Sequence, residues 1–93
     1  MSDSCIISLE NQWKTKTVAA NALFNRDDFN AAMEGYNEAL YKAEALNMHS
    51  TDCLRVRVPY IQIFIISCNN LAYTFEAMGD LEAADKMLKR SVY

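Results

Sequence analysis

Residues 21–40, with the sequence NALFNRDDFNAAMEGYNEAL, are the stretch that most constrains the fold of this chain. The pattern indicates the end of one helix, a tight turn at residues 25–28 and most of a second helix. The same order of features returns once, in residues 70–92, NLAYTFEAMGDLEAADKMLKRSV. Two related helical hairpins thus account for most of the 93 residues. We predict an all-α fold and a single domain over residues 1–93.

The first hairpin is expected at about residues 9–46, after a frayed segment at residues 1–8, although Ile6, Ile7 and Leu9 could pack if the first helix begins earlier. Its second helix, at about residues 29–46, is the most clearly amphipathic in the chain, and Asp28 is its expected N-cap. Gly35 inside this helix costs about 1 kcal/mol relative to alanine. A close approach by another helix would explain that cost. The apolar residues with helical spacing are Phe29, Ala32, Met33, Tyr36, Ala39, Leu40 and Ala43.

A linker is expected at residues 47–52 and the second hairpin at about residues 53–92. Pro59 leaves the start of the third helix open, because proline inside a helix removes a hydrogen bond and clashes with the preceding turn. The helix begins either near Pro59, or near Cys53 with a kink at the proline. We expect the kinked helix, although the alternation in residues 54–58 also permits a short strand.

The third helix is expected to end at about residue 78. Gly79 is the expected C-terminal glycine and Asp80 the N-cap of a fourth helix. The side chains expected to pack the fourth helix are Leu81, Ala84, Leu88 and Val92.

Composition argues against several classes of protein. The net charge of −3 gives no basic patch for nucleic acid. Three cysteines at irregular spacing, Cys5, Cys53 and Cys68, argue against the disulfide framework of a secreted protein. The longest uncharged run, residues 58–75, is interrupted by polar residues, whereas a membrane-spanning helix needs about 20 mostly apolar ones. We therefore expect a soluble, cytoplasmic protein that binds neither nucleic acid nor membrane.

The hairpins resemble tetratricopeptide repeats, which are helix–turn–helix units of about 34 residues with small residues at fixed contacts. The first copy matches at the opening position, the usual glycine, the two usual alanines and the usual aromatic residue, which are here Trp13, Ala20, Ala32, Ala39 and Tyr36. The second copy matches at Ile65, Leu71, Ala72, Gly79, Asp80 and Ala84, with Leu88 at the aromatic and Ser91 at the last alanine position. This resemblance implies four antiparallel helices in a right-handed superhelix or bundle.

The chain departs from this family in its spacing. Ala20 and Ala72 lie 52 residues apart, about 18 more than the usual period. No proline closes the first copy, and Asp85 stands at a usually apolar position. The chain also resembles short tetratricopeptide-like proteins of marine gamma-proteobacteria, through a tryptophan near the start and the sequence IISCNNLA at residues 65–72. That resemblance implies no particular activity.

In the repeat family, the first helix of each hairpin lines a concave groove. The resemblance assigns to such a groove Lys14, Thr17, Asn21, Phe24, Asn25, Asn69, Asn70, Tyr73 and Glu76. Some family members hold a partner's C-terminal carboxylate with lysine and asparagine. Here Asn21 and Asn70 match the asparagine positions, but Thr17 replaces the first lysine. The alternative that these residues only pack or face solvent stays open.

The third helix is apolar on nearly every face, which three other helices can hardly cover. Repeat arrays usually need three or more units to be stable, so two units indicate a homodimer, a partner protein or a longer C-terminal part that covers the third helix. The residues expected on that contact surface are Tyr60, Ile61, Ile63, Phe64 and Ile66.

We expect a non-enzymatic protein–protein interaction module, a small bacterial adaptor whose partner is a protein or peptide. The alternatives are a structural homodimer without a peptide ligand, and a chaperone-like subunit for a secretion component. No catalytic, cofactor-binding or metal site is expected. His49 is the single histidine, and no CxxC or HxxxH pattern accompanies it.

Overall fold

The computed structural model describes residues 1–92, and the side chains of residues 1–91. Within that range the chain forms five α-helices and no strand. They are α1 (Asp3–Asn25), α2 (Phe29–Met48), α3 (Ser50–Arg55), α4 (Tyr60–Ala77) and α5 (Leu81–Val92). The all-α prediction is confirmed. The expected count of four helices is corrected, because the short helix α3 precedes the third long one.

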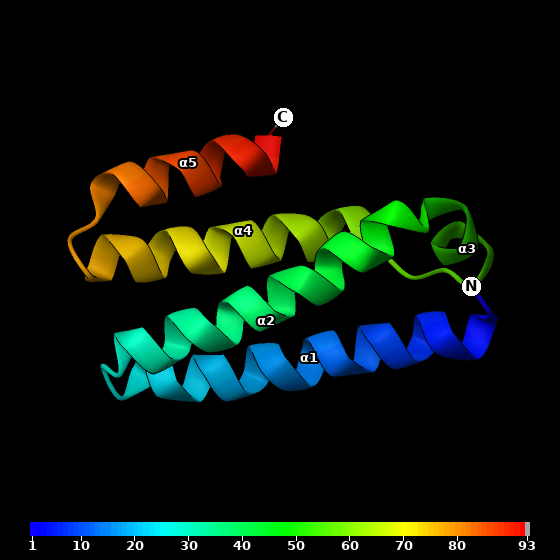
Figure 1. Ribbon diagram of the computed structural model, residues 1–93, viewed down its shortest axis with the longest axis horizontal. Coiled ribbons are helices and arrows are strands. Elements are labelled where there is room, and N and C mark those ends of the chain that lie inside the picture. The colour runs from blue at the N-terminus through cyan, green and yellow to red at the C-terminus, as the bar shows by residue number, and fades with distance from the viewer. Residues whose placement is uncertain (93) are drawn as a thin grey trace.

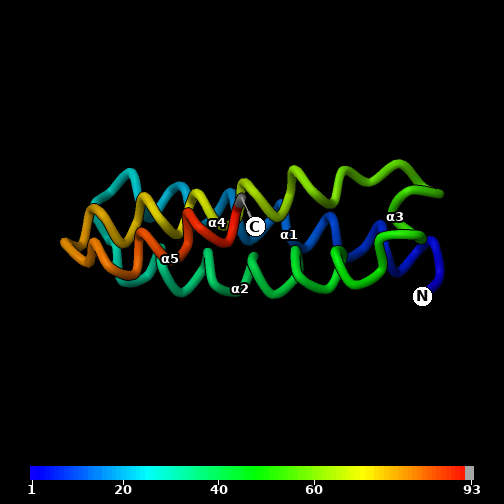
Figure 2. Tube along the Cα trace, turned by 90° about the horizontal axis from the view of Figure 1, so that it is seen from above, coloured from blue at the N-terminus to red at the C-terminus, as the bar shows by residue number. Residues whose placement is uncertain are grey.

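The four long helices pack in the order α1, α2, α4 and α5, each antiparallel to the one before it (Figure 1). The array is flat, with Cα extents of 40 × 27 × 14 Å. Over most of the length of the array, α1 and α4 lie along one side and α2 lies along the other (Figure 2). None of the helices in residues 1–92 combines the length and apolar character needed to span a bilayer.

Helix α1 begins earlier than expected. The Ser2 hydroxyl caps it by accepting from the backbone N–H of Cys5 at 3.2 Å. Ile6, in the second turn, is fully buried. Burial of such a side chain contributes roughly 2 kcal/mol, which orders a segment of weak helix propensity. The prediction that residues 1–8 are frayed is therefore wrong from Asp3 onward.

The connection between the hairpins also differs from the prediction. Helix α2 continues to Met48 and α3 follows at once, so the predicted linker at residues 47–52 is helical except at the junction. Helix α4 begins at Tyr60, with Pro59 as its N-cap residue. The kinked helix from Cys53 and the short strand are both wrong. A proline just before the first turn has no N–H of its own that would need a partner, and it interrupts no hydrogen bond of the helix there.

The two hairpin turns have the same hydrogen-bond pattern. Asp27 and Gly79 adopt left-handed backbone conformations, with φ of 61° and 81°. The next residues, Asp28 and Asp80, donate their backbone N–H to the carbonyl five residues earlier, at 3.0 and 2.9 Å. Their carboxylates accept from the N–H three residues later, at 3.4 and 3.1 Å. The predicted N-caps Asp28 and Asp80 are confirmed, and so is Gly79 as the glycine that follows the end of a helix.

Gly35 lies at a close contact between α2 and Ala20 of α1. A Cβ atom added at Gly35 would lie 3.0 Å from the Cβ of Ala20. The predicted reason for a glycine inside α2 is thus confirmed, because any side chain there would separate the two helices.

Helix α5 packs against α4 through Ala84, as predicted, and through Met87, which was not predicted. Ala84 is buried and Met87 is half-buried against the core. Leu81 and Leu88 are 67% and 44% exposed, so their predicted packing role is corrected. The prediction for Val92 concerns a side chain outside the described residues.

Candidate functional site

A hydrogen bond between two long helices fixes the position of the candidate site. Trp13 of α1 donates through Nε1 to Ser67 Oγ of α4 at 2.7 Å, and both side chains are buried. Ser67 Oγ in turn donates to the carbonyl of Ile63 at 2.8 Å. Helices α1 and α4 are thereby held together, with α2 packed against both.

Helices α1, α2 and α4 line a pocket of about 280 Å³ that is open to solvent on one side, which we call the amide pocket. Its lining residues are Asn21, Phe24 and Asn25 of α1, Tyr36 of α2, and Asn70 and Tyr73 of α4. Asn21 and Asn25 are four residues apart on α1, so they lie on one face of that helix. Asn70 and Tyr73 are three residues apart and share a face of α4. The structure therefore brings together five of the nine residues predicted for a groove.

Tyr36 was predicted as a core residue, and its role in the pocket was missed. The side chain is 4% exposed, and its hydroxyl donates to Asn21 Oδ1. A buried tyrosine hydroxyl usually requires a polar partner. Because position 36 is a tyrosine and not a phenylalanine, the sequence could have indicated a polar contact at this core position.

Burial raises the pKa of the Tyr36 phenol above its usual value of 10.0. The hydroxyl therefore stays protonated at neutral pH and remains a donor. Because it holds Asn21 Oδ1, the Asn21 side chain has a set orientation in the pocket.

The other four predicted groove residues do not line this pocket. Lys14 and Glu76 are exposed, and Asn69 is half-buried. Thr17 is 9% exposed, so its placement on an open groove is corrected. Its Oγ1 is buried without a hydrogen-bond partner among the described residues.

The five residues predicted as a partner surface on α4 do not form one exposed face. Ile63 is 2% exposed and belongs to the core, which corrects its assignment. Tyr60 and Phe64 are half-buried against the core. Ile61 and Ile66 are 58% and 43% exposed. Helices α2 and α5 cover much of α4, whereas Ile61 and Ile66 leave part of its apolar surface exposed.

Phe64 is partly covered by a side chain of α5. The Arg90 guanidinium lies 5.6 Å from the centre of the Phe64 ring, in a cation–π contact. The same arginine pairs with Glu44 of α2 at 2.6 Å. This contact joins α2, α4 and α5, and it covers part of the Phe64 ring.

A second, apolar hollow lies where α3 turns into α4. It has a volume of about 260 Å³, and we call it the corner hollow. Its lining residues are Leu54, Val58, Pro59, Tyr60, Ile61 and Gln62. Leu54 and Ile61 are exposed by 67% and 58%.

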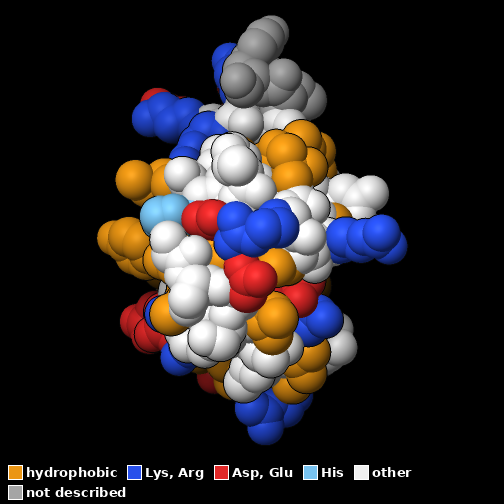
Figure 3. Space-filling model, turned by 90° about the vertical axis from the view of Figure 1, so that its right-hand side faces the viewer, with side chains coloured by type: hydrophobic (Ala, Val, Ile, Leu, Met, Phe, Trp, Pro, Cys, Tyr) orange, Lys and Arg blue, Asp and Glu red, His pale blue; other side chains and the backbone are white. Residues whose placement is uncertain are grey.

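The end of the molecule near α3 carries a row of charged side chains with hydrophobic ones on either side (Figure 3). Arg55 bonds to Asp3 of α1 and to Asp52 at 3.0 Å. His49 Nδ1 lies 3.8 Å from Asp52 Oδ2. Within residues 1–92, no group of three or more His, Cys, Asp or Glu side chains is placed to hold a metal ion. The charged row therefore links α1 to α3.

Two of the three cysteines are part of the core. Cys53 and Cys68 are buried, whereas Cys5 is exposed. Burial raises the pKa of both buried thiols. Cys53 also donates to the carbonyl of Leu46 at 3.3 Å. These two thiols pack as small apolar groups and are poor nucleophiles at neutral pH.

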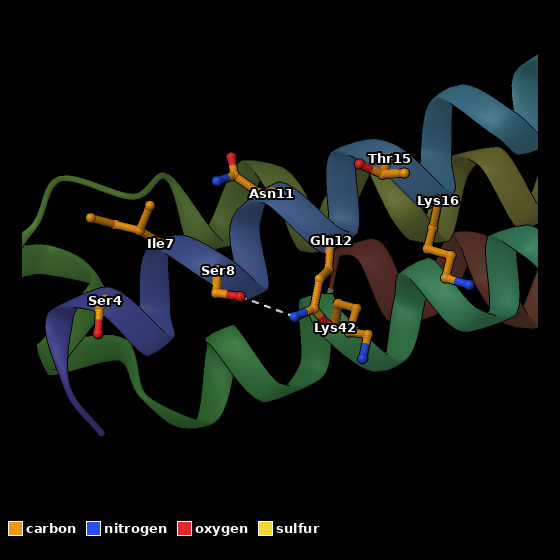
Figure 4. A pocket seen from close by; sticks show the side chains of 8 residues that line it. All are labelled: Ser4, Ile7, Ser8, Asn11, Gln12, Thr15, Lys16 and Lys42. Carbon is orange, nitrogen blue, oxygen red and sulfur yellow. Dashed lines mark hydrogen bonds between the residues drawn. The ribbon is translucent and has the colours of Figure 1, made fainter.

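A polar hollow of about 450 Å³ lies along α1 where it meets Lys42 of α2 (Figure 4). Its other lining residues are Ser4, Ile7, Ser8, Asn11, Gln12, Thr15 and Lys16. Gln12 donates to Ser8 at 3.1 Å, and Lys16 pairs with Glu38 at 2.7 Å. The polar groups of this hollow are exposed and partly satisfied by one another. This hollow is more open than the amide pocket, in which Tyr36 is a buried lining residue.

The chain is thus a small α-helical protein with two antiparallel helical hairpins, and the amide pocket, lined by carboxamides and aromatic rings, lies between them. A family described as "Protein of unknown function (DUF2753)" matches residues 11–92. The chain belongs to this DUF2753 family. No curated protein and no solved structure matches the chain.

Proposed function

We propose that this chain is a non-enzymatic protein–protein interaction module, a small adaptor that binds a segment of another protein in the amide pocket. The observation that carries the proposal is the convergence of Asn21, Phe24 and Asn25 with Asn70 and Tyr73 in one pocket. The first three residues belong to one hairpin and the last two to the other, and the two sets lie 45 or more positions apart in sequence. Exposed aromatic rings beside hydrogen-bonding groups are typical of protein interfaces.

We further infer that the two hairpins are tetratricopeptide-like units of a right-handed superhelix. The turn residues Asp27 and Gly79 lie 52 positions apart, as do the capping residues Asp28 and Asp80. The small residues Ala20 and Ala72 have the same offset, and both are buried. Repetition of turn, cap and small contact at one offset supports a duplicated hairpin, with α3 and its connections as the inserted residues.

A peptide-display selection against the full chain tests the proposed function. Tyr73 is 59% exposed in the pocket, and Tyr41 is 73% exposed on α2 outside it. We expect Tyr73→Ala to weaken a selected binder about tenfold, in the range of an interface aromatic. Tyr41→Ala is the matched control and should leave the affinity unchanged. Binders that lose as much affinity with Tyr41→Ala, or a selection that yields no saturable binder, would refute the proposal.

A homodimer is a second candidate, favoured by the corner hollow. Leu54 and Ile61 expose apolar surface at one end of the molecule, around Pro59. A two-fold dimer would bring this patch against its own copy. The test is molar mass by light scattering over a range of concentrations.

For that dimer we expect twice the chain mass of 10.6 kDa. Ile61→Glu should restore the monomer, and Ile66→Glu should not, because Ile66 does not line the corner hollow. A monomeric wild-type chain at all concentrations would reject this candidate while leaving the adaptor proposal intact.

A further inference from the structure

We propose that the amide pocket selects uncharged peptide groups from the interior of an extended segment, and not a terminal carboxylate. This inference rests on the proposed function and specifies the ligand chemistry of the same site. It follows from the charge of the pocket, from its hydrogen-bonding groups and from the spacing of its asparagines.

The pocket offers no counter-charge to a carboxylate. Each of its lining residues is an asparagine, a tyrosine or a phenylalanine. Lys14, the predicted basic groove residue, lies seven positions before Asn21 on α1. That separation is about 10 Å along a helix axis, and Lys14 does not line the pocket. A carboxylate moved from water into this site would lose hydration without gaining a charged partner.

The hydrogen-bonding groups match those of a peptide bond. A carboxamide has both a donor and an acceptor, like the backbone N–H and C=O. Three carboxamides, from Asn21, Asn25 and Asn70, line the pocket. The Tyr36 hydroxyl donates to Asn21 Oδ1, so the Asn21 amide nitrogen is available to donate to a ligand carbonyl. Tyr36 is therefore a positioning residue for Asn21.

The spacing of two asparagines matches an extended chain. Asn21 and Asn25 are four residues apart on α1, which corresponds to about 6 Å along the helix. Equivalent peptide groups in an extended segment recur every second residue, at about 6.7 Å. A segment lying along α1 would present one peptide group to each asparagine. Tyr73 and Phe24 supply the apolar surface beside them.

The test uses two pools of random hexapeptides and the full chain labelled with ¹⁵N. In one pool both ends are blocked by acetyl and amide groups; in the other only the N-terminus is blocked. Backbone recognition does not depend on sequence, so a pool is a suitable probe. We expect millimolar blocked peptide to shift the side-chain NH₂ signals of Asn21, Asn25 and Asn70. The free-acid pool should bind no more tightly than the blocked pool.

A pair of asparagine variants locates the effect. Asn25→Leu should weaken binding of the blocked pool about fivefold, as expected for the loss of one hydrogen bond. Asn37→Leu is the matched control, because Asn37 is an exposed helical residue of α2 outside the pocket. It should leave the affinity within about twofold. Tyr36→Phe should lower the shift of the Asn21 signal more than that of Asn70, which a purely structural role would not do.

Two outcomes would overturn the inference. One is a free-acid pool that binds at least threefold more tightly through the same asparagines. The other is a blocked pool that shifts none of these signals. Neither outcome decides the adaptor proposal, which fails only if the unbiased selection finds no binder that depends on Tyr73. The two failures are therefore distinguishable.

Discussion

At the scale of residues, a few polar side chains inside the core decide where the helices meet. The only tryptophan, Trp13, is bonded to Ser67 across a sequence separation of 54 residues. Tyr36 is bonded to Asn21 in the same way, between α2 and α1. A buried donor without an acceptor costs about 1–3 kcal/mol. These bonds therefore favour one packing of α1 on its neighbours over others of similar apolar content.

Ser67→Ala should lower the free energy of unfolding by about 2 kcal/mol, because it leaves the Trp13 N–H buried without an acceptor. The measurement is urea unfolding followed by tryptophan fluorescence. Ser8→Ala, at an exposed position of α1, is the control and should change stability by less than about 0.5 kcal/mol. A loss no larger for Ser67→Ala than for the control would contradict the role of this bond.

At the scale of elements, the hairpins depend on how each helix ends. Asp27 and Gly79 occupy equivalent left-handed positions, at φ of 61° and 81°. The aspartates that follow cap the next helix in both turns. A helix end and the next helix start are thus specified within four residues, which keeps the two helices antiparallel and in contact.

Gly79→Ala should destabilise the protein by about 1 kcal/mol, because a residue with a Cβ atom is disfavoured in the left-handed region. No atom lies within 4 Å of the added Cβ, so the cost would come from the backbone alone. Thermal unfolding of the purified variant measures it, and Gly79→Asn should lose less, since asparagine tolerates this conformation. Equal losses in the two variants would argue against a conformational origin.

At the scale of the whole molecule, the flat array is closed at one end by charge pairing. Arg55 of α3 bonds to Asp3 of α1 and to Asp52. The hydrogen bond from Arg55 lowers the pKa of Asp52 below its usual value of 3.8, and the pairing with Asp3 raises the pKa of Arg55. A lowered carboxyl pKa contributes stability above the usual pKa, and that stability is lost as pH falls through the lowered value.

We therefore expect Arg55→Met to reduce the loss of stability between pH 5 and pH 3. The wild-type chain begins to lose the contribution of the Arg55–Asp52 pair as the pH falls below the usual carboxyl pKa of 3.8, whereas the variant lacks this pair at every pH. Urea midpoints at the two pH values measure the difference. Lys86→Met is the control, because Lys86 pairs weakly with Glu82 at 3.7 Å within α5. Identical pH dependence in Arg55→Met and the wild type would exclude a contribution from this pairing.

The features that could be predicted from the amino-acid sequence alone are those that depend on local interactions. The helical spacing in residues 29–43, the caps at Asp28 and Asp80 and the glycine at position 79 each depend on atoms a few positions apart. They could therefore be predicted, as could the face of α1 that carries Asn21 and Asn25. The resemblance to a repeat family also selected most of the residues that line the amide pocket.

Contacts between distant residues were decided only by the tertiary structure. Ile6 orders the start of α1 by burial, and Thr17 is turned into the protein, and neither burial follows from the local sequence alone. Ile63 belongs to the core while Ile61, two positions away, is exposed, because the neighbouring helices cover only part of α4. The bond from Tyr36 to Asn21 depends on how two helices pack side by side. Local propensity fixes where each helix lies in the sequence, whereas packing fixes which of its faces meet.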